Sequence, residues 1–249
     1  MSSSVEQKTP TTSGTLRHLA LIASAGFAVT SQAVAAVSIV QSDASDTTVN
    51  LTTAGTTDWV KLGGGTVPGS RSEKVGADFI GAVAGGPVDF VESDWSGITI
   101  SMSWTDGESP NETGAAVTGS LETKGPAADE TLPTSITFDV SGLEGAYRLV
   151  VYGTAYRTPW SFTAALDGGG ESQTITQGGN NSHTSAFTID FTATAGQTLN
   201  VLYQQTSDGA GNADNIGLAG MTLAAIPEPS SFTLLAGSLA LCLARRRRS

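Results

Sequence analysis

Short segments in which apolar and polar residues alternate recur along most of this 249-residue chain, and they constrain its fold more than any other feature. Alternation with a period of two predicts β-strands that bury one face, and helical periodicity is nearly absent. Most of the segments are rich in Thr, Val, Ile and aromatic residues, which strands favour. We predict eight strands, at residues 47–52, 98–104, 135–140, 147–152, 160–166, 186–192, 198–204 and 216–223.

The predicted strands are separated by clusters of Gly, Asn, Asp and Ser that mark turns. Regular spacing of this kind is typical of an antiparallel β-sandwich of the jelly-roll type. Residues 61–94 are richer in Gly and Pro, and we expect loops with one or two short strands there. Alternation predicts that one core holds Ile98, Ile100, Met102, Trp104, Ile136, Phe138, Val140, Tyr147, Leu149, Val151, Phe187, Ile189, Phe191, Leu199, Val201 and Tyr203.

Residues 1–35 have the three parts of a secretory signal peptide. A polar leader with two basic residues precedes an uncharged apolar run at residues 19–29, and Ala33-Val34-Ala35 forms a small-x-small cleavage site. We expect a signal helix that signal peptidase removes after Ala35, and export of the remaining chain.

Residues 227–249 combine three features in order. Pro227-Glu228-Pro229 forms an extended hinge, because proline fixes φ and donates no hydrogen bond. The uncharged segment at 230–244 would span about 22 Å as a helix, short of the ~30 Å hydrocarbon core of a bilayer. A basic cluster beside an apolar segment stays cytoplasmic. That cluster is Arg245, Arg246, Arg247 and Arg248.

These three features together resemble the PEP-CTERM sorting signal of Gram-negative bacteria that make extracellular polysaccharide. The resemblance implies that an exosortase-type membrane protease processes the chain near Pro-Glu-Pro. It implies transient anchoring in the inner membrane through a short transmembrane helix, then delivery to the cell surface or extracellular matrix. Residues 36–226 would be the ectodomain, a single β-sandwich, and the sorting signal implies nothing about its activity.

The ectodomain is strongly acidic, with six basic residues against 21 acidic ones and a net charge of −15. A negative surface repels phosphate backbones and anionic lipid headgroups, so we expect no nucleic-acid partner. The single cysteine, Cys242, lies in the tail. Disulfides, thiol nucleophiles and thiolate metal ligands are therefore excluded from the ectodomain.

Little in the ectodomain points to catalysis. Its single histidine, His183, lies in a Gly/Asn-rich stretch without a Gly-x-Ser-x-Gly motif, so we interpret it as a solvated loop residue. Hydrolysis of a glycosidic bond needs only two carboxylates, and the sequence marks no particular pair. We predict that the protein is not an enzyme, and a glycosidase or lyase acting on extracellular polysaccharide is one alternative.

A Gly-rich turn at residues 208–215 carries clustered oxygen ligands of the kind that Ca²⁺ prefers. Its spacing lacks the central Gly and the late Glu of an EF-hand, and a simple Asx-turn is the other interpretation. We expect no cofactor other than a structural Ca²⁺ at this turn. The candidate ligands are Asp208, Asn212, Asp214 and Asn215.

Aromatic side chains can stack on the apolar face of a sugar ring. Alternation instead places Trp104 and Trp160 on buried faces, and we expect Trp59 to be buried as well. Binding residues often collect on the loops at one end of a sandwich. We therefore predict a ligand patch formed by a connection after residues 147–152 and the turn after residues 98–104, with the residues Asp106, Glu108, Tyr156 and Arg157.

Several stretches of the ectodomain together resemble galactose-binding-like jelly rolls and carbohydrate-binding modules. They are GTTDWVKLG at 55–63, SWTDG at 103–107, YRLVVYG at 147–153, SFTAALDGG at 161–169, TAGQTLNVLY at 194–203 and IGLAGMTL at 216–223. The resemblance implies a non-catalytic structural or glycan-associated protein whose partner is extracellular polysaccharide. A carbohydrate-binding module for one defined exopolysaccharide is the second alternative.

Overall fold

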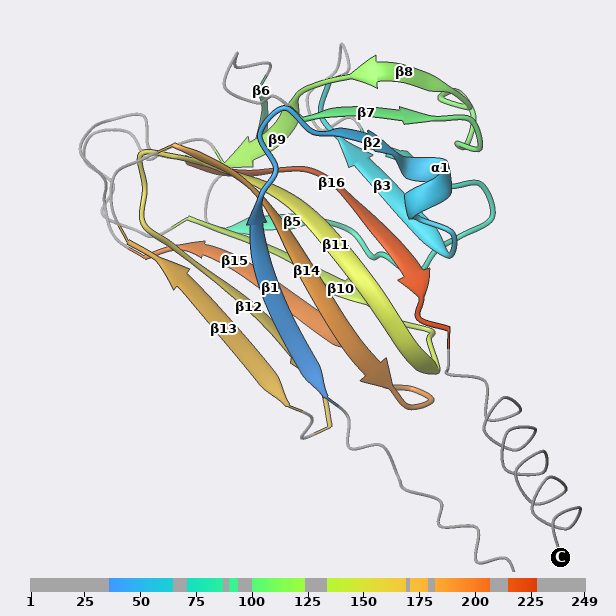
Figure 1. Ribbon diagram of the computed structural model, residues 1–249, viewed down its shortest axis with the longest axis vertical. Helices are drawn as coiled ribbons and strands as arrows, with labels where there is room; N and C mark the ends of the chain where they lie inside the picture. Colours follow the sequence, from blue (N-terminus) through green and yellow to red (C-terminus); the bar gives the residue numbers. More distant parts are fainter. Residues whose placement is uncertain are drawn as a thin grey trace, which may run out of the picture. The chain divides into compact units, whose positions relative to one another are not determined.

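Strands make up almost all of the regular structure in the computed structural model (Figure 1). It describes residues 36–64, 71–86, 90–93, 100–123, 134–168, 171–178, 182–206 and 215–227. The described residues form three sheets, and nearly all strand pairs are antiparallel. The predicted all-β class is confirmed, and the arrangement is consistent with a β-sandwich. The predicted signal helix and the apolar tail helix lie outside the described residues.

The largest sheet runs in the order β1-β14-β11-β16-β3-β4, and β9 joins β16 and in turn pairs with β6. Long strands at its centre, β14, β11 and β16, supply most of its pairing. The strands are β1 (Val37–Asp43), β3 (Asp58–Leu62), β4 (Arg71–Glu73), β6 (Phe90–Ser93), β9 (Ser120–Thr123), β11 (Gly145–Tyr156), β14 (His183–Ala193) and β16 (Asn215–Ala225).

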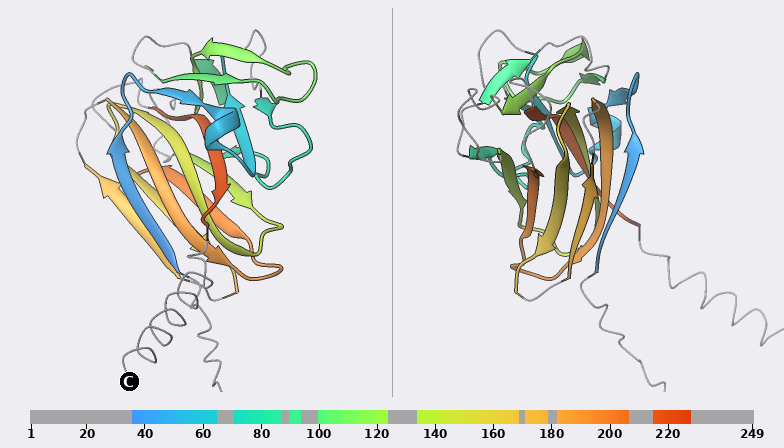
Figure 2. Two further views of the ribbon diagram at one scale, coloured as in Figure 1. Left: turned by 45° about the vertical axis from the view of Figure 1, so that its right-hand side comes forward. Right: turned by 90° about the vertical axis from the view of Figure 1, so that its left-hand side faces the viewer.

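A five-stranded sheet faces the large sheet and forms the second layer of the sandwich, as the two views of Figure 2 show. Its order is β13-β12-β15-β10-β5, and all of its strand pairs are antiparallel. The strands are β5 (Ala84–Gly86), β10 (Ser135–Val140), β12 (Trp160–Leu166), β13 (Ser172–Gln177) and β15 (Leu199–Gln205).

A small third sheet lies beside the large one, next to the four-residue helix α1 (Leu51–Ala54) (Figure 1). Its strands are β2 (Thr48–Asn50), β7 (Ser101–Trp104) and β8 (Gly114–Val117), and β2 pairs with β7 in parallel. Asn50 caps α1 by accepting a hydrogen bond from the Thr53 backbone N–H. Within the described residues, no helix is long and apolar enough to cross a membrane.

The apolar side chains divide into two clusters, so the prediction of one core is wrong. The larger cluster fills the space between the two main sheets and includes Phe162, Phe187 and Tyr203, whose rings pack against one another. Ile100, Met102 and Trp104 are buried as predicted, but they belong to a second cluster. That cluster packs on the other face of the large sheet, where Tyr152 and Ala219 contribute to it.

The two main sheets are tied together at one edge by glutamine side chains. Gln173 in β13 accepts a hydrogen bond from the Ile39 backbone N–H in β1. Gln41 of β1 donates to the side chain of Gln177 in β13 at 2.9 Å and to Ser185 in β14 at 3.0 Å. These bonds occupy polar groups along the edge of β1, where unpaired backbone would invite pairing with another chain.

A buried lysine holds the end of β3 in place. Lys61 is 1% exposed, and its ammonium group donates to the backbone carbonyls of Leu62, Gly63 and Gly119 at 2.6–3.2 Å. Gly63 has a φ of +68°, and an added Cβ would lie 2.4 Å from the Ser120 carbonyl oxygen. Position 63 therefore requires glycine, because the backbone of residue 120 lies too close for a side chain. Lys61 supplies hydrogen bonds to the buried carbonyls at this point.

Candidate functional site

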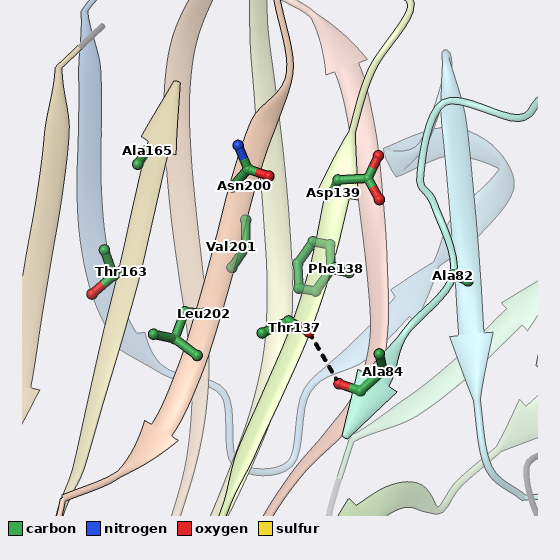
Figure 3. Close-up of a pocket in the computed structure, with 10 residues that line it drawn as sticks. All are labelled: Ala82, Ala84, Thr137, Phe138, Asp139, Thr163, Ala165, Asn200, Val201 and Leu202. Carbon is green, nitrogen blue, oxygen red and sulfur yellow. Dashed lines mark hydrogen bonds between the residues drawn. The ribbon is translucent and has the colours of Figure 1, made fainter. Parts of the chain in front are cut away.

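The outer face of the five-stranded sheet carries a groove of about 400 Å³ (Figure 3). It crosses strands β12, β15 and β10 and is bounded on one side by the segment that leads into β5. Alternate residues of these strands point into the core, and the others point outward and form most of the surface of the groove, with the core residues Phe138 and Val201 beneath them. Its lining is Ala82, Ala84, Thr137, Phe138, Asp139, Thr163, Ala165, Asn200, Val201 and Leu202.

Strand register arranges the outward side chains of the groove in two rows. Asp139 lies directly opposite Asn200, and Asn200 lies opposite Ala165 on its other side. In the second row, Leu202 lies between Thr137 and Thr163. A carboxylate and an amide therefore occupy one row, and an apolar side chain between two hydroxyls occupies the other.

The polar groups of the second row are engaged within the fold. The Thr163 hydroxyl is hydrogen-bonded to the Thr174 hydroxyl at 2.9 Å. The Thr137 hydroxyl donates to the Ala84 carbonyl at 3.4 Å, as the dashed line in Figure 3 shows. These two threonines therefore contribute mainly shape to the groove.

The polar groups of the first row are not engaged. Neither the Asp139 carboxylate nor the Asn200 side-chain amide makes a hydrogen bond or an ion pair within the described part of the chain. Gly81 lies against the carboxylate, where an added Cβ would be 2.5 Å from an Asp139 oxygen. Asp139 and Asn200 thus offer free hydrogen-bonding capacity side by side in the groove, and the sequence pattern had not singled them out.

No lysine or arginine of the described ranges lines the groove. Of the five basic residues that the structure describes, Arg71, Lys74 and Arg148 each form an ion pair with a neighbouring carboxylate. Lys61 is buried, and Arg157 lies in the turn before β12, outside the lining. Among the described residues that line the groove, Asp139 alone carries an ionisable side chain.

Tryptophan does not form a sugar-stacking surface in the described residues. Trp59, Trp104 and Trp160 are at most 4% exposed, which confirms the prediction that they are core residues. Trp59 and Trp104 pack against each other with ring centroids 5.5 Å apart. The fourth tryptophan, Trp95, lies outside the described residues.

Asp106 serves the fold at the position where the sequence predicted a ligand. Its carboxylate accepts hydrogen bonds from Thr52 at 2.5 Å and from the Trp59 indole at 3.0 Å, and it forms an ion pair with Lys74. Burial by itself would raise the pKa of Asp106, but these hydrogen bonds and the charge of Lys74 outweigh it and hold the pKa below its ordinary value. Glu108 nearby accepts a hydrogen bond from the Gly76 backbone N–H at 3.3 Å.

Tyr156 and Arg157 lie elsewhere, so the structure does not bring the four predicted patch residues together. Tyr156 is the last residue of β11, not part of a connection, and it pairs with Asn215 at the start of β16. Trp59, which holds Asp106, pairs with Thr222 of β16. Thr222 lies seven residues after Asn215 in β16, which is a separation of about 23 Å at ~3.3 Å per residue.

The end of the sandwich near Tyr156 gathers residues from two of the predicted sites. The Arg157 guanidinium covers the Tyr156 ring at 5.1 Å from its centroid. Asn215, a predicted calcium ligand, donates its side-chain amide to Glu122 at 2.9 Å. The ring of His183 contacts the Gln177 amide at 2.7 Å, and His183 begins β14 instead of lying in a loop.

Most of the other predicted functional residues lie outside the described part of the chain. They are the calcium candidates Asp208, Asn212 and Asp214 and the sorting residues Glu228, Pro229 and Arg245 to Arg248. Pro227 is described and is exposed just beyond β16. Among the described residues, no group of three or more His, Cys, Asp or Glu side chains is arranged to hold a metal ion.

No protein family matches the chain, and no curated protein is similar to it in sequence. Several solved structures overlap with it in part. A family 61 carbohydrate-binding module in complex with β-1,4-galactotriose is 11% identical, with a TM-score of 0.38, over 58% of this chain and 88% of the module. The enzymatically active domain of tailspike protein 4 from bacteriophage CBA120 is 11% identical, with a TM-score of 0.36, over 59% of this chain and 19% of that one.

A third structure is a Paenibacillus cycloisomaltooligosaccharide glucanotransferase complexed with cycloisomaltoheptaose. It is 16% identical, with a TM-score of 0.25, over 54% of this chain and 18% of the enzyme. Of these three structures, the binding module and the glucanotransferase each hold a bound saccharide. Overlap at this level does not establish a shared function.

Proposed function

We propose that this chain is an exported, non-catalytic protein that associates with an extracellular polysaccharide through the groove on the five-stranded sheet. The observation that carries the proposal is the lining of the groove, which combines small apolar side chains with the free polar groups of Asp139 and Asn200. Sugar chains present the same mixture of apolar ring faces and hydroxyls. An open sheet face also accepts the middle of a long polymer, without requiring a chain end.

A non-catalytic role is supported by the acid–base content of the groove. Most glycoside hydrolases act through two carboxylates that flank the scissile bond. In the part of the chain that the structure describes, this groove is lined by one carboxylate, that of Asp139, and the amide of Asn200 faces it from the next strand. The arrangement favours binding over the glycosidase or lyase alternative.

Export is supported by the signal-peptide pattern at residues 1–35 and by the PEP-CTERM-like tail at residues 227–249. Processing by an exosortase-type protease would remove the arginine cluster. Mass spectrometry of the mature protein from a host with a working exosortase should therefore find no product that ends with Arg248. A mature product that retains Arg248 would contradict this part of the proposal.

The binding function is tested by a glycan array probed with the full-length chain, without bias toward any one polysaccharide. We expect retention on one or a few related glycans and no release of shortened sugars from them. The proposal fails if the folded chain is retained on none of them. Release of reducing sugar ends from a retained glycan would instead support the glycosidase alternative.

A further inference from the structure

We propose that Asp139 and Asn200 determine the specificity of the groove, and that they select a neutral glycan with adjacent hydroxyl groups over an acidic one. The inference rests on the proposed glycan-binding function and narrows it to a class of ligand. It follows from two properties of this pair, which are its hydrogen-bonding capacity and its charge.

The hydrogen-bonding capacity of the pair matches neighbouring sugar hydroxyls. An ionised carboxylate only accepts hydrogen bonds, whereas the asparagine amide both donates and accepts. A hydroxyl that donates to Asp139 can therefore accept from Asn200, and the next hydroxyl can use the remaining oxygens. Directly opposed residues of an antiparallel pair have Cβ atoms about 4.5–5.5 Å apart, so both side chains can reach one sugar unit.

The surroundings of the pair leave room for a ring. Ala165 flanks Asn200, and Ala82 lies in the lining on the side of Asp139. Leu202 in the neighbouring row offers an apolar contact for a ring face. Because the nearby threonine hydroxyls are already hydrogen-bonded, Asp139 and Asn200 are the groups of the lining whose bonding a ligand completes.

The charge of the pair excludes acidic sugars. No lysine or arginine that the structure describes pairs with Asp139, since Arg71, Lys74 and Arg148 are paired with other carboxylates and Arg157 lies outside the groove. A uronate or sulfate group placed next to this carboxylate would be desolvated without a counter-ion and repelled by it. A neutral hydroxyl meets no such penalty.

The test is affinity electrophoresis of the full-length chain in native gels that contain a neutral or an acidic polysaccharide. Dextran, β-1,4-galactan and xyloglucan are the neutral probes, and alginate and polygalacturonate are the acidic ones. We expect a neutral probe to retard the wild type and the acidic probes to leave it unretarded. Asp139→Ala and Asn200→Ala should each raise the Kd for the neutral glycan about tenfold, which is the effect of losing one hydrogen bond to the ligand.

Two further variants make the result specific. Glu144→Gln removes an exposed carboxylate outside the groove and should bind like the wild type. Asp139→Asn keeps the shape but removes the charge, so it should gain measurable retardation by alginate or polygalacturonate. A change of fold alone would not produce that gain, and thermal melting of each variant checks the fold directly.

The outcomes separate this inference from the function on which it rests. If the wild type binds a neutral glycan and both alanine variants bind it equally well, the pair has no role and the binding function stands. Equal or stronger retardation by the acidic probes overturns the charge selection. If the wild type binds none of the probes and is retained on no glycan array, both the inference and the proposed function fail.

Discussion

Two buried or partly buried aspartates show how position decides what a carboxylate does in this chain. Asp58 is 2% exposed, and its oxygens accept backbone N–H bonds from Trp59 at 2.7 Å, Phe79 at 3.0 Å and Ile80 at 2.9 Å. Burial raises the pKa of Asp58, and the three N–H bonds offset only part of that rise. Asp106 has the opposite balance, with a pKa held below its ordinary value.

The two aspartates should therefore affect stability with opposite dependence on pH. The ordinary aspartate pKa is 3.8. Since the pKa of Asp58 is raised in the folded state, its contribution to the free energy of unfolding is fully present below about pH 3.8. This contribution is lost as the pH rises through the raised pKa. The contribution of Asp106 is present above pH 3.8 and is lost as the pH falls through its lowered value.

Urea unfolding at pH 3 and pH 7 measures this difference. We expect Asp58→Asn to lower the free energy of unfolding by about 1 to 3 kcal/mol, because an amide cannot accept all three N–H bonds, and to cost more at pH 3 than at pH 7. Asp106→Asn should lower the free energy of unfolding more at pH 7 than at pH 3. Glu144→Gln serves as the control and should change little at either pH. The same pH trend for both aspartate variants would contradict this account of their surroundings.

At the scale of elements, alternation was a reliable guide where a strand buries one face against the main core. All the described segments predicted as strands contain strands, and in β10, β14 and β15 the predicted inward side chains are buried. The stretch at residues 47–52 is shorter than predicted, because α1 begins at Leu51. Apolar residues at every second position are enough to locate such strands, because every second side chain of a strand points to the same, buried face.

Strands without a simple alternation were missed. β1 and β13 lie at sheet edges. Their polar residues, such as Gln41 and Gln173, form hydrogen bonds between the two sheets instead of packing in the core. β3 is buried on both faces, and its charged residues Asp58 and Lys61 are buried together with its apolar ones, so burial along this strand does not follow an apolar–polar alternation. For residues 61–94 we predicted loops with one or two short strands, and the structure places β4, β5, β6 and the end of β3 there.

The division into two apolar clusters was also beyond the sequence pattern. Alternation shows which residues of a strand share a face, but not against which sheet that face packs. Trp104 and Phe162 follow the same pattern and lie in different clusters. The candidate groove was missed for a related reason, because Asp139 and Asn200 are 61 positions apart and become neighbours only through the pairing of β10 with β15.

At the scale of the whole molecule, the outer faces of the two main sheets differ. The large sheet carries the second apolar cluster on its outer side, whereas the five-stranded sheet leaves an open groove on its outer side whose described lining residues include no lysine or arginine. The residues of the ligand patch predicted from the loops lie apart, since Asp106 is hydrogen-bonded to Trp59 and Tyr156 is the last residue of β11. The outer face of the five-stranded sheet is therefore the surface on which a glycan chain is expected.

The most direct test of this account is to locate bound glycan on the protein. Full-length, ¹⁵N-labelled chain would be titrated with a neutral polysaccharide fragment that it retains, and backbone amide shifts would be followed by NMR. The account predicts that the largest shifts fall in β10 and β15, at Thr137, Asp139 and Asn200, and that they disappear in Asn200→Ala. Shifts confined to Tyr156, Arg157 and Asn215 at the other site would contradict it.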